Sequence, residues 1–237
     1  NQINKAIQIK EAINNNLEQQ AQAIFKEKII LACNSERNKI IGEYCQVKSG
    51  YAFKSDWWQS DGVKVIKIGN LENNSINLTT CACVSEDKIY KAQNFRVITG
   101  DLLIAMTGAT AGKLAIIPKT NEFLFVNQRV GKFLLGNDPI SKLSFIYCNL
   151  MQKEVLQDII SGGDGSSAQA NISPDNIMQT TIYYPDKNII DYFNNICKPL
   201  FEVIAYNHYK IQALSRLRDT LLPNLMSGDS SDKLSFI

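Results

Sequence analysis

Two stretches with a helical repeat of apolar residues bracket a long segment in which short apolar runs alternate with glycines and turn residues. The first stretch, residues 3–31, holds neither proline nor glycine, and its apolar side chains recur mostly in steps of three and four. At a rise of about 1.5 Å per residue, it predicts an amphipathic helix about 40 Å long. The apolar positions of this stripe are Ile3, Ile7, Ile13, Leu17, Ala21, Ile24 and Phe25.

The central segment has a different pattern. Runs rich in β-branched and aromatic residues at 63–68, 102–105, 114–117 and 123–126 predict strands. Residues 145–160 are typical of a helix, which we expect to end at Gly162 and Gly163. Strands and helices do not alternate regularly along this segment. The sequence therefore predicts the α+β class and not a repeating βαβ fold.

After Pro185 the helical pattern returns with a heptad repeat, which Pro223 is expected to end. A polar layer at Asn207 and Lys210 interrupts the repeat, and such layers cost stability but fix the partner. Each long helix could pack only on its own domain, or the two could form a protruding, antiparallel, coiled-coil-like pair that is also an interface. We expect the second arrangement, with interface residues Ile13, Leu17, Ile24, Leu200, Asn207, Leu214, Leu217 and Leu221.

These patterns divide the chain into an N-terminal helix at residues 1–35, a β-rich domain at 36–185, a C-terminal helix at 186–226 and a tail at 227–237. The chain does not begin with methionine, so we expect it to follow a removed tag or to be cut from a longer protein. It has no run of eighteen apolar residues and no signal-peptide pattern, which predicts a cytoplasmic protein without a membrane partner.

Composition adds little to this picture. The formal net charge is only +2 at pH 7, so any electrostatic attraction to nucleic acid must come from charge placed on one face. The six cysteines are scattered without a C-x-x-C pair, and the chain has a single histidine, His208. We therefore expect reduced, mostly buried thiols, with no disulfide framework, no metal site and no cofactor.

Residues 108–113, Gly-Ala-Thr-Ala-Gly-Lys, resemble part of a phosphate-binding loop but depart from it in two ways. Only three residues separate the glycines, and Leu114 stands where Ser or Thr would ligate magnesium. The following residues also predict a strand, whereas a phosphate site needs a helix N-terminus. His208 lies within the C-terminal helix, with no nucleophile beside it in the local sequence. These features favour binding over catalysis, and we expect no enzyme activity.

Short motifs along nearly the whole chain, taken in order, resemble the target-recognition domains of type I restriction-modification specificity subunits. They are Leu17-Glu-Gln-Gln-Ala-Gln-Ala-Ile-Phe25, Gly50-Tyr-Ala-Phe53 with Ser55, Gly62-Val-Lys-Val-Ile-Lys-Ile-Gly-Asn70, Gly100-Asp-Leu-Leu-Ile-Ala-Met-Thr-Gly108 with Gly112, Asn127-Gln-Arg-Val130, Gly165-Ser-Ser-Ala-Gln-Ala-Asn-Ile172, Tyr183-Tyr-Pro185, and Leu214-Ser-Arg-Leu-Arg-Asp-Thr-Leu-Leu-Pro223 with Ser227-Gly228.

The resemblance implies a sequence-specific binder of double-stranded DNA. In this family each recognition domain reads one half of a split site, and conserved antiparallel helices separate two such domains. Methyltransferase subunits dock on these helices and carry the catalysis with S-adenosylmethionine, and the restriction subunit joins through the assembled complex. This sequence holds one recognition domain, so it resembles a half subunit or an excised half. A natural half would pair with a second copy and read an inverted repeat.

Candidate DNA contacts follow from side-chain chemistry. Arg and Lys pair with guanine edges, and Asn and Gln pair with adenine edges. We expect Asn127, Gln128 and Arg129 to read bases, with a polar strand end as the alternative. Close to phosphates we expect Thr107, Thr110 and Lys113 on the glycine turn, together with Lys54 and Lys67. A second polar loop is expected to contact either the sugar-phosphate backbone or bases: Ser166, Ser167, Gln169 and Asn171.

Alternatives remain open for these segments. The glycine turn could be a plain hairpin turn, and the second polar loop could be merely solvated. Trp57 and Trp58 are expected to be buried anchors and not base-stacking platforms. A rival from another class is a protein-interaction module that dimerises through its helices, and a steep salt dependence of binding to duplex DNA would argue against it.

Overall fold

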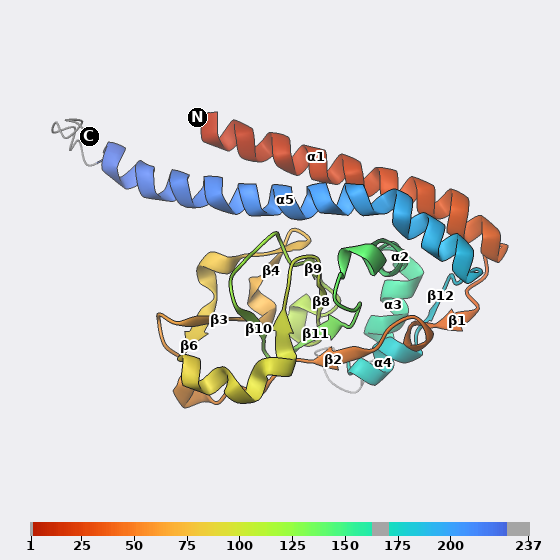
Figure 1. The fold of residues 1–237 in the computed structure, drawn as a ribbon, viewed down its shortest axis with the longest axis horizontal. Coiled ribbons are helices and arrows are strands. Elements are labelled where there is room, and N and C mark those ends of the chain that lie inside the picture. Colours follow the sequence, from red (N-terminus) through yellow and green to blue (C-terminus); the bar gives the residue numbers. More distant parts are fainter. Residues whose placement is uncertain (1, 163–170, 227–237) are drawn as a thin grey trace.

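In the computed structural model, which describes residues 2–162 and 171–226, a pair of long helices lies along one side of a mixed domain. Helix α1 (Gln2–Phe25) continues through the helical turns η1 (Lys26–Ile30) and η2 (Leu31–Cys33). Helix α5 (Lys187–Met226) runs back antiparallel to α1, so that the N-terminus and the end of α5 lie at the same end of the molecule (Figure 1). The expected α+β class with two long terminal helices is confirmed.

The domain contains two sheets of four strands each. One has the order β6 (Ala82–Val84), β3 (Val63–Ile66), β10 (Leu124–Val126) and β7 (Arg96–Val97), with β3 and β10 parallel. The other has the antiparallel order β2 (Val47–Ser49), β11 (Val130–Phe133), β8 (Leu102–Ala105) and β9 (Leu114–Ile116). The four runs that predicted strands are confirmed as β3, β8, β9 and β10.

Short elements connect these sheets to each other and to the helices. Two-stranded pairs form between β1 (Lys39–Ile40) and β12 (Thr181–Ile182) and between β4 (Leu71–Glu72) and β5 (Ser75–Ile76). Helices α2 (Ile140–Leu150), α3 (Lys153–Ser161) and α4 (Pro174–Gln179) follow the second sheet. Further helical segments in the described residues are the single turns η3 (Ile41–Glu43), η4 (Ser55–Trp57), η5 (Ile68–Asn70), η6 (Leu78–Thr80) and η8 (Gly108–Thr110) and the longer η7 (Glu86–Phe95).

Strand β8 shows why the central runs are apolar without alternation. Its side chains point in turn to two separate cores: Leu102 and Ile104 join a core shared with the long helices, whereas Leu103 and Ala105 join a core between the sheets. A strand buried on both faces requires a continuous apolar run. The second sheet is therefore covered on both sides, and its functional side chains must come from the turns at its strand ends.

Two expectations about helix boundaries are wrong. Residues 145–160 do not form one helix, because α2 ends at Leu150 and α3 begins at Lys153. Gln152 at the break has an extended backbone. Its side-chain Nε2 donates to the Cys148 carbonyl (2.9 Å) and to Gln22 Oε1 in α1 (2.8 Å). Helix α5 also continues past Pro223, the residue expected to end it, and ends at Met226, the last residue of the expected C-terminal helix.

Among residues 2–162 and 171–226, no helix combines the length and the apolar character that crossing a bilayer requires.

Candidate nucleic-acid interface

Segments that are far apart in the sequence meet at one end of the second sheet. The Gln128 N–H donates to the Tyr51 carbonyl (3.0 Å), and the Met106 N–H donates to the Arg129 carbonyl (3.0 Å). The Ile172 N–H in turn donates to the Met106 carbonyl (2.8 Å). Isolated bridges join Tyr51 to Asn127 and Thr107 to Asn171. The backbone thus holds Asn127, Gln128, Arg129, Thr107 and Asn171 side by side.

The turn that carries Gln128 and Arg129 connects β10 to β11 and is closed by a hydrogen bond from the Val130 N–H to the Asn127 carbonyl (2.9 Å). Gly50 crosses directly beneath it, where a Cβ atom would lie 2.3 Å from the Val126 carbonyl oxygen. Only glycine fits there. Asn127 is half-buried, while Gln128 and Arg129 are exposed. Among the described residues, none forms a hydrogen bond or ion pair with the Gln128 or Arg129 side chain.

The glycine turn at residues 108–113 links β8 to β9 and lies next to Thr107. Gly108 (φ +76°) and Gly112 (φ +86°) adopt the left-handed conformation that glycine tolerates. The Gly112 N–H donates to the Ala105 carbonyl (2.8 Å), which keeps the turn compact. Strand β9 follows the turn, so the turn does not open a helix as a nucleotide-phosphate loop does.

Three of the predicted contact residues belong to this turn or border it. Lys113 is exposed, and Thr107 and Thr110 are half-buried. Within the part of the chain that the structure describes, the hydroxyl oxygens of both threonines are buried without a hydrogen-bond partner.

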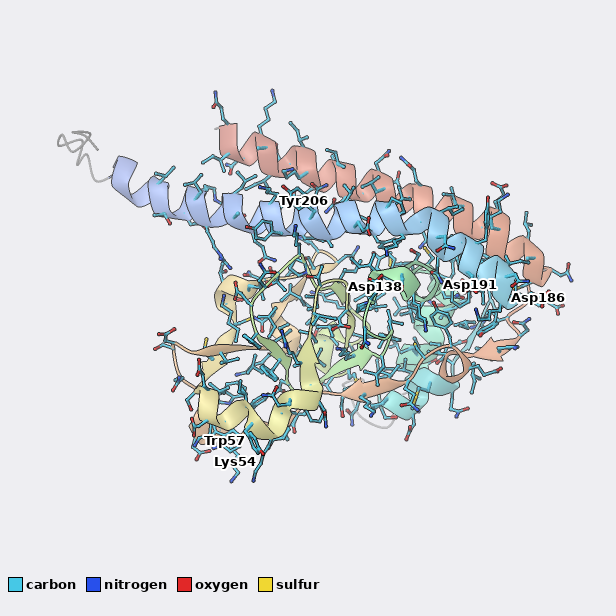
Figure 2. All side chains as sticks on the ribbon, viewed as in Figure 1. Lys54, Trp57, Asp138, Asp186, Asp191 and Tyr206 are labelled. Atoms are coloured by element: carbon cyan, nitrogen blue, oxygen red, sulfur yellow. The ribbon has the colours of Figure 1, made fainter. Side chains whose placement is uncertain are left out.

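Lysines and aromatic rings form a neighbouring cluster at the end of β3. The Asn127 N–H donates to the Ile66 carbonyl (2.9 Å), which brings Lys67 next to the turn that carries Gln128 and Arg129. Lys67 Nζ lies 3.5 Å from the centre of the Trp58 ring, and Lys54 Nζ lies 5.6 Å from that of Trp57. Burial lowers the pKa of Lys67. Figure 2 places Lys54 and Trp57 on the side of the domain away from the long helices.

Trp57 and Trp58 are half-buried and pack against the small core of Phe53, Val65, Val84, Ala92 and Phe125. Tyr51 stacks on Trp57 at 6.4 Å with the rings 13° from parallel. Tyr51 and Lys88 are not among the DNA contacts predicted from the sequence. Lys88 Nζ lies 5.8 Å from the Trp57 ring centre. The motif that contains Tyr51 was a signal, but nothing in the local sequence relates Lys88 to the cluster.

The second polar loop is only partly described. Asn171 is exposed and bridges to Thr107. Ser166, Ser167 and Gln169 lie outside the described residues.

The predicted helix-interface residues fall into two groups. Leu17, Ile24 and Leu200 are half-buried against the core that joins the helices to the domain, Leu214 is half-buried, and Asn207 is buried. Ile13, Leu217 and Leu221 are exposed on the single chain. Asn207 contacts two residues of α1: its Nδ2 donates to Asn14 Oδ1 (2.8 Å), and its Oδ1 accepts from Lys10 Nζ (3.3 Å). The polar layer therefore joins Asn207 to α1 and does not involve the expected Lys210.

His208 is buried next to this layer, and burial lowers its pKa to about 4, so the imidazole is neutral at pH 7. It lines a cleft of ≈ 680 Å³ between the two helices and the β4–β5 hairpin, together with Asn14 and Glu18. Burial raises the pKa of Glu18. Over the described ranges, the cysteines are unpaired and no group of three His, Cys, Asp or Glu side chains is arranged to hold a metal ion.

Comparison with known proteins relates this arrangement to one family. The family described as "Type I restriction modification DNA specificity domain" matches residues 34–213, which include the whole domain and much of α5. The chain belongs to this family. The match confirms the resemblance inferred from the short motifs.

Individual relatives agree. The type I restriction enzyme MjaVIII specificity subunit of Methanocaldococcus jannaschii is 28% identical over 127 residues, which cover 52% of this chain and 30% of that protein. The HindI specificity subunit of Haemophilus influenzae is 27% identical over 173 residues, covering 71% and 36%. The crystal structure of the type I restriction-modification system S subunit from M. genitalium is similar in fold, with a TM-score of 0.54 and 15% identity, over 93% of this chain and 55% of that one.

The chain therefore spans about a third of the length of these curated relatives and about half of the solved S subunit.

Proposed function

We propose that this type I specificity domain reads one half of a split site on double-stranded DNA. The observation that carries the proposal is the convergence of Asn127, Gln128, Arg129, Thr107 and Asn171 at one end of the second sheet. Amide and guanidinium groups can each present two hydrogen-bonding atoms to a base edge in the major groove. Gln128 and Arg129 are exposed at the turn between β10 and β11, where a duplex could reach them.

The surrounding side chains suit phosphate contacts. Lys113 extends from the glycine turn beside Thr107, and Lys67 and Lys54 are steadied by the rings of Trp58 and Trp57. Such contacts fix the orientation of a protein on the duplex but carry no sequence information. Because each phosphate that these side chains neutralise releases a counterion, we expect binding to duplex DNA to weaken steeply as the salt concentration rises.

This assignment is tested by comparing alanine variants on two duplexes, one carrying the preferred sequence and one of random sequence. Arg129→Ala should cost about 1–3 kcal/mol on the preferred duplex and relax discrimination at one base pair. Lys113→Ala should weaken binding to both duplexes equally and lower the salt slope by about 1. Arg216→Ala, which changes an exposed arginine on α5, is the matched control. The base-reading role is wrong if Arg129→Ala keeps both affinity and preferred sequence.

We further propose that the chain is non-catalytic and acts through partners. Methylation and cleavage would be carried out by a methyltransferase subunit docked on the long helices and by a restriction subunit in the assembled complex. In a methyl-transfer assay with labelled S-adenosylmethionine, the chain alone should transfer no label to DNA. Adding the methyltransferase subunit should produce transfer that Gln128→Ala weakens. Transfer by the chain alone would contradict this division of labour.

The helices are also proposed to pair with a second copy of the chain. Apolar side chains stay exposed on both of them, including Ile9 and Ile13 on α1 and Val203 and Leu217 on α5. A two-fold pair of chains would read an inverted repeat, because the symmetry of the protein is imposed on its target. Sedimentation equilibrium of the isolated chain measures this association directly. A monomer at all concentrations, with an asymmetric preferred site, would contradict it.

A further inference from the structure

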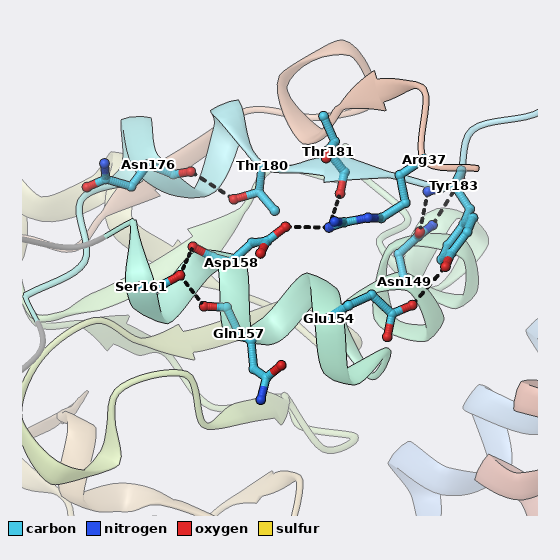
Figure 3. A network of polar contacts seen from close by, with 10 residues as sticks. All are labelled: Arg37, Asn149, Glu154, Gln157, Asp158, Ser161, Asn176, Thr180, Thr181 and Tyr183. Atoms are coloured by element: carbon cyan, nitrogen blue, oxygen red, sulfur yellow. Dashed lines mark hydrogen bonds and ion pairs between the residues drawn. The ribbon is translucent and has the colours of Figure 1, made fainter. Parts of the chain in front are cut away.

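An ion pair ties the segment that follows the first long helix to α3. Arg37 Nη1 lies 2.5 Å from Asp158 Oδ2 and also donates to the Thr181 carbonyl of β12 (3.3 Å), as Figure 3 shows. The Arg37 side chain is 25% exposed and that of Asp158 is 48% exposed, so the pair is partly open to solvent. Arg37 stands between η2 and β1, where the chain passes from the helix pair into the domain.

A second contact holds the same face of α3. The Tyr183 hydroxyl donates to Glu154 Oε1 (2.8 Å). The Asn149 amide fixes Tyr183 in turn, because it accepts from the Tyr183 N–H (2.9 Å) and donates to the Tyr183 carbonyl (3.3 Å). Glu154 and Asp158 are four residues apart and therefore share one face of the helix. Arg37 and Tyr183 thus anchor this face at two points one turn apart.

The opposite face of α3 supports the glycine turn. Leu156 and Ile160 are each two residues from an anchored acid, which at about 100° per residue places them on the far side of the helix. A Cβ atom at Gly112 would lie 2.9 Å from Ile160 Cδ1 and 3.3 Å from Leu156 Cδ1. These two side chains therefore lie directly against the turn that carries Thr110 and Lys113. Helix α3 connects Arg37 on one side with this turn on the other.

We propose that Arg37 and Asp158 are positioning residues for the glycine turn at residues 108–113, acting through α3. Burial of Val155 and Ile159 in the main core holds α3 against the domain, and the ion pair adds a second constraint on how the helix lies. Leu156 and Ile160 transmit that position to Gly112. The consequence for recognition rests on the proposed function, since it requires the turn to contact DNA. The mechanical support of the glycine turn by α3 does not depend on the proposed function. The pair also links the junction with the long helices to the turn, so a displacement of the helix pair would reach the contact residues through Arg37.

Hydrogen exchange tests the mechanical part without DNA. The reporters are the amides of Gly112 and Lys113, which donate within the turn to Ala105 and Thr110. Arg37→Met removes the charge and both bonds but keeps an apolar stem. We expect exchange at these two amides to rise about threefold, the scale of a partly exposed ion pair. Strand β10 in the other sheet serves as the internal reference, and its exchange should not change.

A matched control is available in the same chain. Lys64 and Glu122 form an ion pair of the same length, 2.5 Å, with similar exposure of the two side chains (27% and 43%, against 25% and 48% for Arg37 and Asp158). Lys64→Met should leave exchange in the turn unchanged. Arg37→Lys, which keeps the charge, should restore most of the protection. Turn exchange that is equal in Arg37→Met and wild type overturns the proposal, as does an equal rise in Lys64→Met.

A second arm measures the ratio of affinities for the preferred duplex and a random duplex. If α3 positions the contact turn, Arg37→Met should lower this ratio about threefold, whereas Lys64→Met should not change it. Faster turn exchange with an unchanged ratio overturns the link to recognition. Faster turn exchange in a chain whose wild type binds no DNA supports the mechanical role of Arg37 and overturns the proposed function instead. The two failures are therefore distinguishable.

Discussion

The two ends of the helix pair are held by different chemistry. Near the junction where the chain enters the domain, Ala21, Phe25 and Ile29 are completely buried, and the Phe25 ring packs edge-on against Phe193 of α5 at 5.6 Å. Toward the N-terminus, α1 buries only Ile7 and Asn14. There the inter-helix contacts are directional: Asn207 Nδ2 donates to Asn14 (2.8 Å), and Lys10 Nζ donates to Asn207 Oδ1 (3.3 Å).

This difference separates stability from pairing specificity. Apolar burial contributes most of the free energy but accepts many partners, whereas a buried amide pair contributes little and accepts few. The two helices are antiparallel, so a step of seven residues toward the N-terminus of α1 corresponds to seven toward the C-terminus of α5. One heptad on either side of the asparagine pair, Ile7 therefore faces Leu214 and Ala21 faces Leu200. A shift by one heptad would place both asparagines against apolar residues. The asparagine pair thus fixes one register of the two helices, and the apolar contacts around Phe25 supply most of the stability of the pair.

The largest expected effect is at the apolar end. Phe25→Ala should lower the free energy of unfolding by about 3–5 kcal/mol, because the ring is fully buried against Phe193, Phe145 and Tyr183. Urea denaturation followed by circular dichroism measures this change. Ile9→Ala, at an exposed position on the same helix, should stay within about 0.5 kcal/mol of wild type. Similar losses in the two variants would remove the contrast between the ends.

For the asparagine pair, we expect a single substitution to destabilise the chain and the double substitution to restore its stability. Asn207→Leu leaves Asn14 Oδ1 buried without its donor and should cost about 1–3 kcal/mol. Asn14→Leu with Asn207→Leu should recover that loss, since an apolar layer needs no partner. The double variant should also elute as more than one species in size-exclusion chromatography. Additive destabilisation, or a stable double variant that stays one species, would contradict a role in pairing.

His208 should make the polar end sensitive to acid. Its pKa is lowered to about 4 in the folded chain from the ordinary 6.5, so the unfolded chain binds more protons between these values. Stability should therefore fall as the pH drops from about 6.5 to about 4, by up to about 1.4 kcal/mol per unit. Glu18, whose pKa is raised, acts in the opposite direction and is present in both proteins compared. His208→Gln should flatten the measured slope, and an unchanged slope would contradict the assignment.

The smallest effect on folding is expected where the helices are open to solvent. Leu217 is 48% exposed, so Leu217→Lys should change the free energy of unfolding by no more than about 0.5 kcal/mol. If the exposed apolar face pairs with a second copy, the same change should abolish the dimer in sedimentation equilibrium. Unchanged association would place the proposed contact between copies elsewhere.

The sequence predicted the features that depend on local pattern. The two long helices and the strands β3, β8, β9 and β10 follow from apolar periodicity and from β-branched runs. The break between α2 and α3 was missed because it contains neither glycine nor proline. It is stabilised by the contact of Gln152 with Gln22, which is 130 residues away in the sequence.

The candidate site was predicted residue by residue but not as an arrangement. The types of Gln128, Arg129 and Lys113 indicated their chemistry, whereas their proximity depends on long-range pairing, such as the parallel pair of β3 and β10. Asn14 was missed at the helix seam because Ile13, its apolar neighbour, fits the same periodicity. The choice between adjacent positions is made by the rotation of α1 on the domain, which a local pattern does not specify.

Selection from a random duplex pool measures sequence reading by Gln128 and Arg129. The wild-type chain and the variant Gln128→Ala with Arg129→Ala should be carried through the same rounds of binding and sequencing, with the methyltransferase subunit present in both. We expect the wild type to enrich a defined half-site. The double variant should lose that sequence preference but still bind DNA. Enrichment of the same sequence by both proteins, or of none by the wild type, would contradict this expectation.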